Sequence, residues 1–429
     1  MFTNESRRFA AYGMSQKSDS DLPMLRVETA LLARVLVRAC PRRTGIVPSV
    51  IRCWLLLVFC TLTSPAFGQA PMISVGEENW QKPWVPDLQR PDRQIPIPLE
   101  RRVDVLILGD GYLPAEQTQF EQDIQKWYDR FVSLTPFREL RGAFRVRGLW
   151  KPSQERATAE QKSWFRAAVD TGKVVNATSS QTVAAVFGAL DEVEINRATL
   201  DHRLSHAYVV MLIKDERMRN PSGVSRRLIT SDKRLQVAVA FGADSHHEFG
   251  HAYGGLRDEY INQPGKMAPP QDHRPPSLFT ISNLGYTRSA EQLPWSHLSP
   301  GSPLNPDRTS LIGRLWMGGG PEEGVWHSEA RCLMNGTHEN WNLQKTRRGA
   351  GLRDPKRFCF WCEEIVMART WQRTGQLGAA DDGETLWQEW VKVRPQYQKA
   401  FQVPERFQRQ NAANADARLE QARIYERPQ

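Results

Sequence analysis

Residues 247–251 read His-Glu-Phe-Gly-His, and this pentapeptide constrains the chain more than any other segment. In a helix, residues four positions apart share a face, so His247 and His251 can bind one Zn²⁺ ion together. Glu248 then lies beside the ion, where its carboxylate can take a proton from water. A short motif also occurs by chance on ordinary helices with two surface histidines, so the surrounding residues have to decide between the two interpretations.

The residues after the motif offer a third ligand. Gly254 and Gly255 can end the helix, because glycine tolerates the left-handed turn found at helix C-termini. In the metzincin pattern the third ligand follows a glycine by three positions, and Asp258 stands at that interval after Gly255. The sequence therefore predicts that Zn²⁺ is bound by His247, His251 and Asp258.

Other third ligands remain open at this point. Glu259 is the second choice, since it also follows the glycines closely. If both carboxylates serve other purposes, a distant histidine such as His273 or His327 would complete the site. His246 is out of register with the metal-binding face, because the residue four positions on is a glycine.

The first part of the chain is typical of an export signal. An apolar run at residues 53–63 follows several arginines and precedes small residues at Ala66 and Gly68. The run is shorter than the roughly 20 apolar residues that a membrane-spanning helix needs. We therefore expect a signal peptide around 47–68. The protein is then secreted or periplasmic, without stable membrane insertion. Translation is expected to start near Val47 or Val50, which makes residues 1–46 a gene-model artefact within a leader of 68 residues.

Composition adds little about partners. The 429 residues are 40% hydrophobic and carry a formal net charge of +9. Residues 1–68 contribute nine Lys/Arg and four Asp/Glu, so the leader holds more than half of that excess. No basic stripe interleaved with aromatic residues is present, and we expect no nucleic-acid partner. The oligomeric state is not indicated.

Hydrophobic periodicity indicates alternating strands and helices between the leader and the motif. We therefore predict an α+β (α/β-like) catalytic domain over 101–375, with a twisted, mostly parallel sheet, packed helices and the zinc-binding helix. It follows an extended lead-in at 69–100 and precedes a charged helical tail at 376–429. The predicted elements are strands at 103–108, 144–150, 207–213 and 236–241, helices at 115–134 and 181–200, and a surface loop at 151–180.

Three blocks of the chain resemble the IgA-peptidase-like family of zinc metallopeptidases. They are residues 107–112 (Ile-Leu-Gly-Asp-Gly-Tyr), residues 247–260 around the motif, and Cys332-Leu-Met-Asn335 followed by residues 358–362 (Phe-Cys-Phe-Trp-Cys). The resemblance implies a secreted, zinc-dependent endopeptidase with a metzincin-like catalytic domain. It also implies that Met334 lies in a Met-turn beneath the metal.

Cys332, Cys359 and Cys362 are the cysteines that remain beyond the leader. In an exported protein, a disulfide between Cys332 and one member of the Cys-x-x-Cys pair is the favoured interpretation. The same spacing looks somewhat like the structural zinc site of archaeal-type metzincins, but a fourth cysteine is absent. A redox-active pair is the least favoured, because no thioredoxin-like unit surrounds it.

The predicted reaction is hydrolysis of peptide bonds in a protein or peptide substrate. Zinc activates a water molecule and Glu248 acts as general base. Arg257 and Tyr260 are placed to contact substrate or to brace the ligand loop, although for Arg257 surface packing is the favoured interpretation. Two other functions remain open, namely a zinc amidase that acts on cell-wall or glycan-linked peptides, and a catalytically silent surface-binding module with the same fold.

Overall fold

The computed structural model divides the chain into two units, residues 1–67 and 68–429. Only the second unit contains residues that the structure describes. The predicted signal peptide therefore lies outside the described residues, and so does His273 within the second unit. The description covers residues 71–416 except 78–83, 88, 91–92, 158–162, 167, 171–172, 177–178, 192–206, 215–222, 230–233, 241–244, 270–276, 279, 336–351, 354–356 and 379–381.

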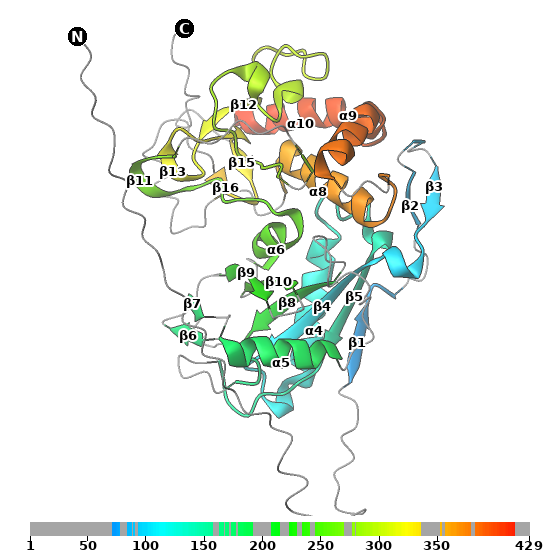
Figure 1. Cartoon of the computed structure of the whole chain (residues 1–429), viewed down its shortest axis with the longest axis vertical. Helices are drawn as coiled ribbons and strands as arrows, with labels where there is room; N and C mark the ends of the chain where they lie inside the picture. The colour runs from blue at the N-terminus through cyan, green and yellow to red at the C-terminus, as the bar shows by residue number, and fades with distance from the viewer. Residues whose placement is uncertain are drawn as a thin grey trace, which may run out of the picture. The chain divides into compact units, whose positions relative to one another are not determined.

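A six-stranded mixed sheet organises the second unit (Figure 1). Its four inner strands run parallel to one another, and the two edge strands are antiparallel to their neighbours. In spatial order the strands are β1 (Met72–Val75), β5 (Phe144–Leu149), β4 (Val103–Asp110), β8 (Ala207–Ile213), β10 (Arg234–Ala240) and β9 (Gly223–Ile229). Together with the helices described below, this sheet makes the unit a mixed α/β structure.

The central strands form because they are continuously apolar. Every residue of β4 is buried, as expected for a parallel strand that is covered on both faces. Its neighbour β8 pairs with it in register, so that Val105 lies opposite Tyr208 and Ile107 opposite Val210. The four predicted strands and two predicted helices are confirmed, although the described part of the second helix ends at Asp191.

Two features of the sheet region differ from the prediction. The predicted loop at 151–180 contains a short hairpin formed by β6 (Ala168–Asp170) and β7 (Lys173–Asn176). Strand β9 was not predicted, because arginines interrupt its apolar residues. It is nevertheless paired along its whole length with β10, from Gly223 to Ile229.

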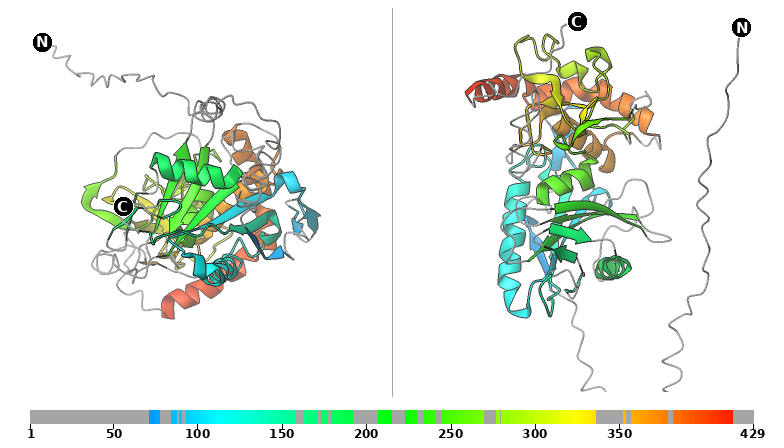
Figure 2. Two further views of the ribbon diagram at one scale, coloured as in Figure 1. Left: turned by 90° about the horizontal axis from the view of Figure 1, so that it is seen from below. Right: turned by 90° about the vertical axis from the view of Figure 1, so that its left-hand side faces the viewer.

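Three helices cover the sheet, namely α4 (Gln117–Phe131), α5 (Ser180–Asp191) and α6 (Ser245–Gly254). Helix α6 carries the motif and lies on the opposite side of the sheet from α5 (Figure 2). Tyr208 of β8 packs edge-on against Phe249 and Tyr253 of α6. Trp127 of α4 stacks on His246, so α4 and α6 share a hydrophobic core.

Helix α8 (Phe360–Arg373) also packs on α6. The hydroxyl of Tyr253 is 2.7 Å from Thr370 Oγ1. The guanidinium of Arg369 donates to the carbonyl of Gly254, and Arg373 donates to the carbonyl of Tyr253 at 3.1 Å. Helix α6 is thus fixed by the sheet, α4 and α8, and nine of its ten residues are buried.

The last part of the chain is helical, as predicted, but it forms two helices, α9 (Gly383–Ala400) and α10 (Val403–Asp416). Trp390 and Tyr397 of α9 pack against Trp371 of α8. No helix among the described residues is long and apolar enough to cross a membrane. The remaining strands are β2 (Trp84–Pro86), β3 (Gln94–Pro96), β11 (Ile261–Met267), β12 (Ile312–Met317), β13 (Gly320–Glu323), β14 (Trp326–Glu329), β15 (Arg331–Cys332) and β16 (Leu352–Arg353), with 3-10 turns at Leu99–Arg101, Pro114–Glu116, Arg141–Ala143, Ala290–Gln292 and Ser296–Leu298.

Candidate metal centre

Three side-chain atoms converge beside helix α6. The Nε2 atoms of His247 and His251 are 3.1 Å apart. Asp258 Oδ1 lies 3.0 Å from Nε2 of His247 and 3.1 Å from Nε2 of His251. The sequence-predicted ligand set is therefore brought together in space, with one atom of each residue at the corner of a nearly equilateral triangle.

Backbone carbonyls orient both imidazole rings. His247 Nδ1 lies 2.8 Å from the carbonyl oxygen of Leu333, and His251 Nδ1 lies 2.6 Å from that of Leu256. A carbonyl can only accept, so each Nδ1 carries the proton. Each Nε2 then faces Asp258 and is the nitrogen that would bind a metal ion once it carries no proton, as in metal-binding histidines.

The end of helix α6 directs Asp258 back toward the histidines. Gly255 has a φ of +60°, and a Cβ at this position would come within 2.0 Å of the Arg369 guanidinium. Asn283 then holds the returning loop on both sides, because its Oδ1 accepts from Arg257 N at 2.7 Å and its Nδ2 donates to Arg257 O at 2.8 Å. The conformation of Gly255 and the two hydrogen bonds with Asn283 together keep the Asp258 side chain directed toward the histidines.

The site attracts positive charge. Burial favours a neutral His251 ring, but the Asp258 carboxylate and the nearby Glu248 carboxylate outweigh it and raise the pKa of His251 to about 9. Burial likewise opposes ionisation of Asp258, while hydrogen bonds to the two histidines lower its pKa well below the usual range. A carboxylate oxygen of Glu248 lies within 4.8 Å of ligand atoms of both histidines.

Met334 lies beneath the motif helix. It is fully buried, and a Cβ on Gly250 would approach its sulfur to 2.8 Å. The backbone around it contacts both sides of the site, since Leu333 O accepts from His247 and Met334 O accepts from Glu259 N at 2.9 Å. Met334 thus packs against the helix that carries the two histidines.

The alternative ligands lie elsewhere. Glu259 is completely buried, and its Oε1 lies 3.1 Å from the sulfur of Cys362, away from the histidine pair. His327 is also buried and faces Glu259, with its Nδ1 3.7 Å from Glu259 Oε2. The ring of His246 bonds to the carbonyl of Trp127 at 2.9 Å, and burial lowers its pKa to about 3. Of the two carboxylates considered as the third ligand, only that of Asp258 therefore lies beside the histidines.

The predicted disulfide is contradicted. Cys332, Cys359 and Cys362 are all free and buried, and the sulfurs of Cys332 and Cys362 are 3.8 Å apart. All three sulfurs lie close to one carboxylate oxygen of Glu259. The cysteines therefore form a cluster next to the histidine site.

Two residues near the site were missed or only partly interpreted from the sequence. Asn283 lies more than twenty positions after the motif, in a segment without regular patterning, so no local signal marks it.

Tyr260 is half-buried with its ring 6.4 Å from that of His247. Burial and the charge of Asp258 raise the pKa of Tyr260, so the phenol stays protonated and can donate a hydrogen bond. Arg257 is exposed and donates to the hydroxyl of Tyr286 at 3.2 Å, in line with the surface packing favoured from the sequence.

Comparison with known proteins adds a family to this geometry. The family model described as IgA Peptidase M64 matches residues 96–306. This range includes every strand of the six-stranded sheet except β1, together with helix α6 and Asp258, and it ends before Met334 and the three cysteines. No curated protein matches the chain. The match supports an IgA-peptidase-like metallopeptidase family for this chain, and a peptidase as its class of activity.

Proposed function

We propose that this protein is a secreted, zinc-dependent endopeptidase with a metzincin-like catalytic domain, whose metal ligands are His247, His251 and Asp258. The observation that carries the proposal is the triangle formed by the two Nε2 atoms and Asp258 Oδ1, with sides of 3.0 to 3.1 Å. The match to a metallopeptidase family supports the same conclusion independently of the geometry.

The donor set fits zinc. Bonds of about 2.0–2.1 Å from a tetrahedral zinc ion would separate two ligand atoms by roughly 3.4 Å, close to the observed sides. Two imidazoles and one carboxylate leave a fourth position for water or substrate, as in zinc sites that perform catalysis. Bound there, zinc would lower the pKa of a water molecule to about 7 and polarise the scissile carbonyl group.

Glu248 is the proposed general base. Its carboxylate lies within 4.8 Å of the ligand atoms of His247 and His251. From there it can accept the proton of the attacking water and pass it to the amine of the leaving peptide. Metal binding alone would not require a glutamate at this position, so its presence favours a catalytic centre over a silent binding module.

A cleavage assay with casein tests the proposal. The purified protein is expected to cleave casein, to lose this activity in o-phenanthroline, and to regain it when Zn²⁺ is added back. Folded proteins, peptidoglycan fragments and acyl amino acids compared in one panel separate an endopeptidase from an amidase. Activity on casein that survives complete metal removal would refute zinc dependence, and activity confined to peptidoglycan fragments would favour the amidase.

The proposed location outside the cytoplasm rests on the apolar run at residues 53–63 and the small residues that follow it. N-terminal sequencing of the exported protein is expected to find Gln69 or a residue close to it as the first residue. An intact leader on the exported protein would contradict the proposed cleavage.

A further inference from the structure

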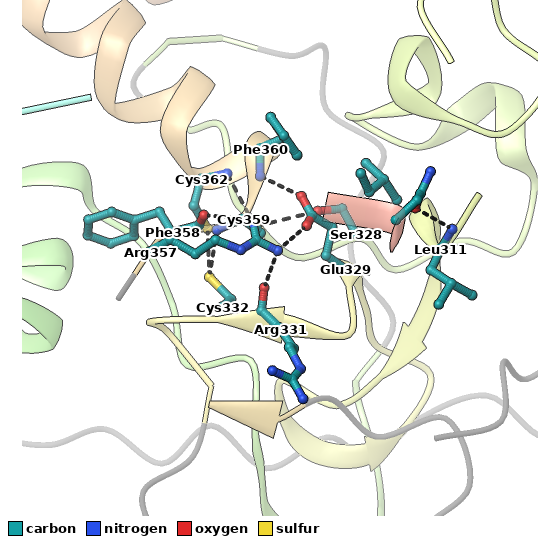
Figure 3. Close-up of polar contacts among 12 residues, drawn as sticks. Leu311, Ser328, Glu329, Arg331, Cys332, Arg357, Phe358, Cys359, Phe360 and Cys362 are labelled. Carbon is teal, nitrogen blue, oxygen red and sulfur yellow. Dashed lines mark hydrogen bonds and ion pairs between the residues drawn. The ribbon is translucent and has the colours of Figure 1, made fainter. Parts of the chain in front are cut away.

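Four buried side chains form a second cluster of metal-ligand atoms. They are Glu259, Cys332, Cys359 and Cys362, and one ligand atom from each lies within 4.8 Å of all the others. The cysteines come from the end of β15 and the start of α8 (Figure 3). The cluster is separate from the histidine site, because none of its members is a proposed ligand there.

The distances suit a tetrahedral zinc ion. Zinc–sulfur bonds of about 2.3 Å place two sulfur ligands roughly 3.8 Å apart. The sulfurs of Cys332 and Cys362 are 3.8 Å apart. Glu259 Oε1 is 3.1 Å from the sulfur of Cys362 and 3.7 Å from that of Cys359. The carboxylate thus supplies the fourth ligand that the cysteine pattern lacks.

The backbone around the cluster favours thiolates. Amide N–H groups of Met334 and Cys359 donate to the sulfur of Cys332, at 3.4 and 3.2 Å. The amide of Cys362 donates to the sulfur of Cys359 at 3.4 Å. Hydrogen bonds from buried amides stabilise negative charge on sulfur, and a metal ion requires the deprotonated form. Three neutral thiols would be stabilised less by these amide donors than thiolates would be.

The carboxylate of Glu259 is costly to bury without a cation. It has no exposed surface, and its Oε2 has no hydrogen-bond partner among the described residues. His327 is the basic side chain that faces it, and Nδ1 of His327 also lacks a hydrogen-bond partner in the described part of the chain. Asn283 Nδ2 donates to Oε1 at 2.9 Å, and a bound metal ion would neutralise the buried negative charge that this hydrogen bond leaves uncompensated.

We propose that Glu259, Cys332, Cys359 and Cys362 bind a second zinc ion, which has a structural role. All four positions are occupied by protein atoms, as in zinc sites that stabilise a fold and do not bind substrate. The three thiols would release their protons to solvent as the ion binds. The proposal does not depend on peptidase activity.

The second ion would also hold the first site in place. Glu259 follows Asp258 directly, and its amide donates to the carbonyl of Met334 at 2.9 Å. Cys332 lies two residues before Met334, whose neighbour Leu333 orients His247. Binding at the cysteine cluster would therefore tie the loop of the third ligand to the turn beneath α6, and its loss should weaken zinc binding at the histidine site.

Metal and thiol analysis of the unmodified full-length protein tests the proposal directly. We expect two zinc ions per chain, and peptide mapping after unfolding and alkylation without reductant should find Cys332, Cys359 and Cys362 all modified. Cobalt substitution should produce thiolate-to-cobalt charge-transfer absorption, which the histidine site has no sulfur ligand to produce. One zinc ion per chain without this absorption, or a disulfide joining any two of these cysteines, would overturn the proposal.

Two variants assign the absorption to the cluster. His251→Ala should lose the histidine-bound ion and keep the charge-transfer absorption. Glu259→Gln, which preserves the shape of the side chain, should release the sulfur-bound ion to a chelator at least tenfold faster than the unmodified protein. Glu329→Gln is the matched control, because this buried glutamate adjoins the cluster but bonds to Phe360 N and Arg357 (Figure 3). Equal release rates for Glu259→Gln and Glu329→Gln would remove Glu259 from the site.

Discussion

Asp258 and Glu259 are consecutive residues whose carboxylates belong to different clusters. Asp258 Oδ1 lies 3.0 Å from Nε2 of His247, and Glu259 Oε1 lies 3.1 Å from the sulfur of Cys362. The amide N–H between them donates to the carbonyl of Met334, and Asn283 holds the preceding residue by donating to Arg257 O. One short loop therefore serves two sites, and its conformation decides which carboxylate faces which site.

Asp258→Ala is expected to lose zinc at the histidine site. Removal of a hydrogen-bond partner of a metal ligand typically weakens binding by about 10–100-fold, so removal of the ligand itself should cost more than about 100-fold. Competition with a chelator measures the change. Arg257→Ala is the control, since the Arg257 side chain bonds to Tyr286 at the surface and should retain zinc. Unchanged zinc affinity in Asp258→Ala would exclude Asp258 as a ligand.

Asn283→Ala should weaken the first site without removing a ligand. The side chain makes three hydrogen bonds to the Arg257–Glu259 loop, two with Arg257 and one of 2.9 Å to Glu259. Their loss should lower zinc affinity by about 10–100-fold and the free energy of unfolding by roughly 1–3 kcal/mol. Calorimetric zinc titration and urea unfolding measure the two effects. A variant with normal values for both would show that the loop holds its shape without Asn283.

Gly255→Ala should destabilise the protein by about 1–3 kcal/mol, because the position needs a positive φ and a Cβ there would meet Arg369. Gly188→Ala on α5 is the matched control. Nothing lies within 4 Å of a Cβ at Gly188, so alanine should stabilise that helix by up to about 1 kcal/mol. Thermal unfolding of both variants checks the prediction, which fails if the two substitutions shift stability equally.

Local patterns predicted the parts of the fold that local forces determine. The apolar run at 207–213 became β8 with the same bounds, because an uninterrupted run of buried residues suits only a central strand. Strand β9 escaped prediction, since its sequence Gly-Val-Ser-Arg-Arg-Leu-Ile shows no clear alternation. Its pairing along β10 depends on a neighbour and not on its own residues.

The candidate site was predictable where its spacing is local. His247, Glu248 and His251 follow from one helical turn, whereas the choice between Asp258 and Glu259 depends on contacts with Asn283 and Met334, far along the chain. The fourth member of the cysteine cluster was missed for the same reason. Sequence spacing pointed to a missing cysteine, and only the fold brings the Glu259 carboxylate to that position.

The ion pair between Glu116 and Arg156 should give a small pH dependence of stability. The hydrogen bond from Arg156 lowers the pKa of Glu116. A carboxyl with a lower pKa in the folded state adds stability above its unfolded value of about 4.3, and this contribution disappears as the pH falls. Because both side chains are partly exposed, the contribution should stay below about 1 kcal/mol.

Comparison with Glu116→Gln isolates this contribution. The free energy of unfolding of the unmodified protein should exceed that of Glu116→Gln at pH 7, and the difference should shrink below about pH 4. Acid also removes metal from histidine ligands, but this affects both proteins alike and cancels in the difference. A difference that is constant or grows on acidification would contradict the assigned ion pair.

The most direct test of the proposed mechanism measures zinc content and casein cleavage together in the variant Glu248→Gln. The substitution leaves His247, His251 and Asp258 intact, so the variant should bind the same amount of zinc as the unmodified protein. Its turnover should fall by at least about 100-fold, because the general base is gone. Full zinc content with unchanged turnover would contradict the proposed role of Glu248 and the mechanism built on it.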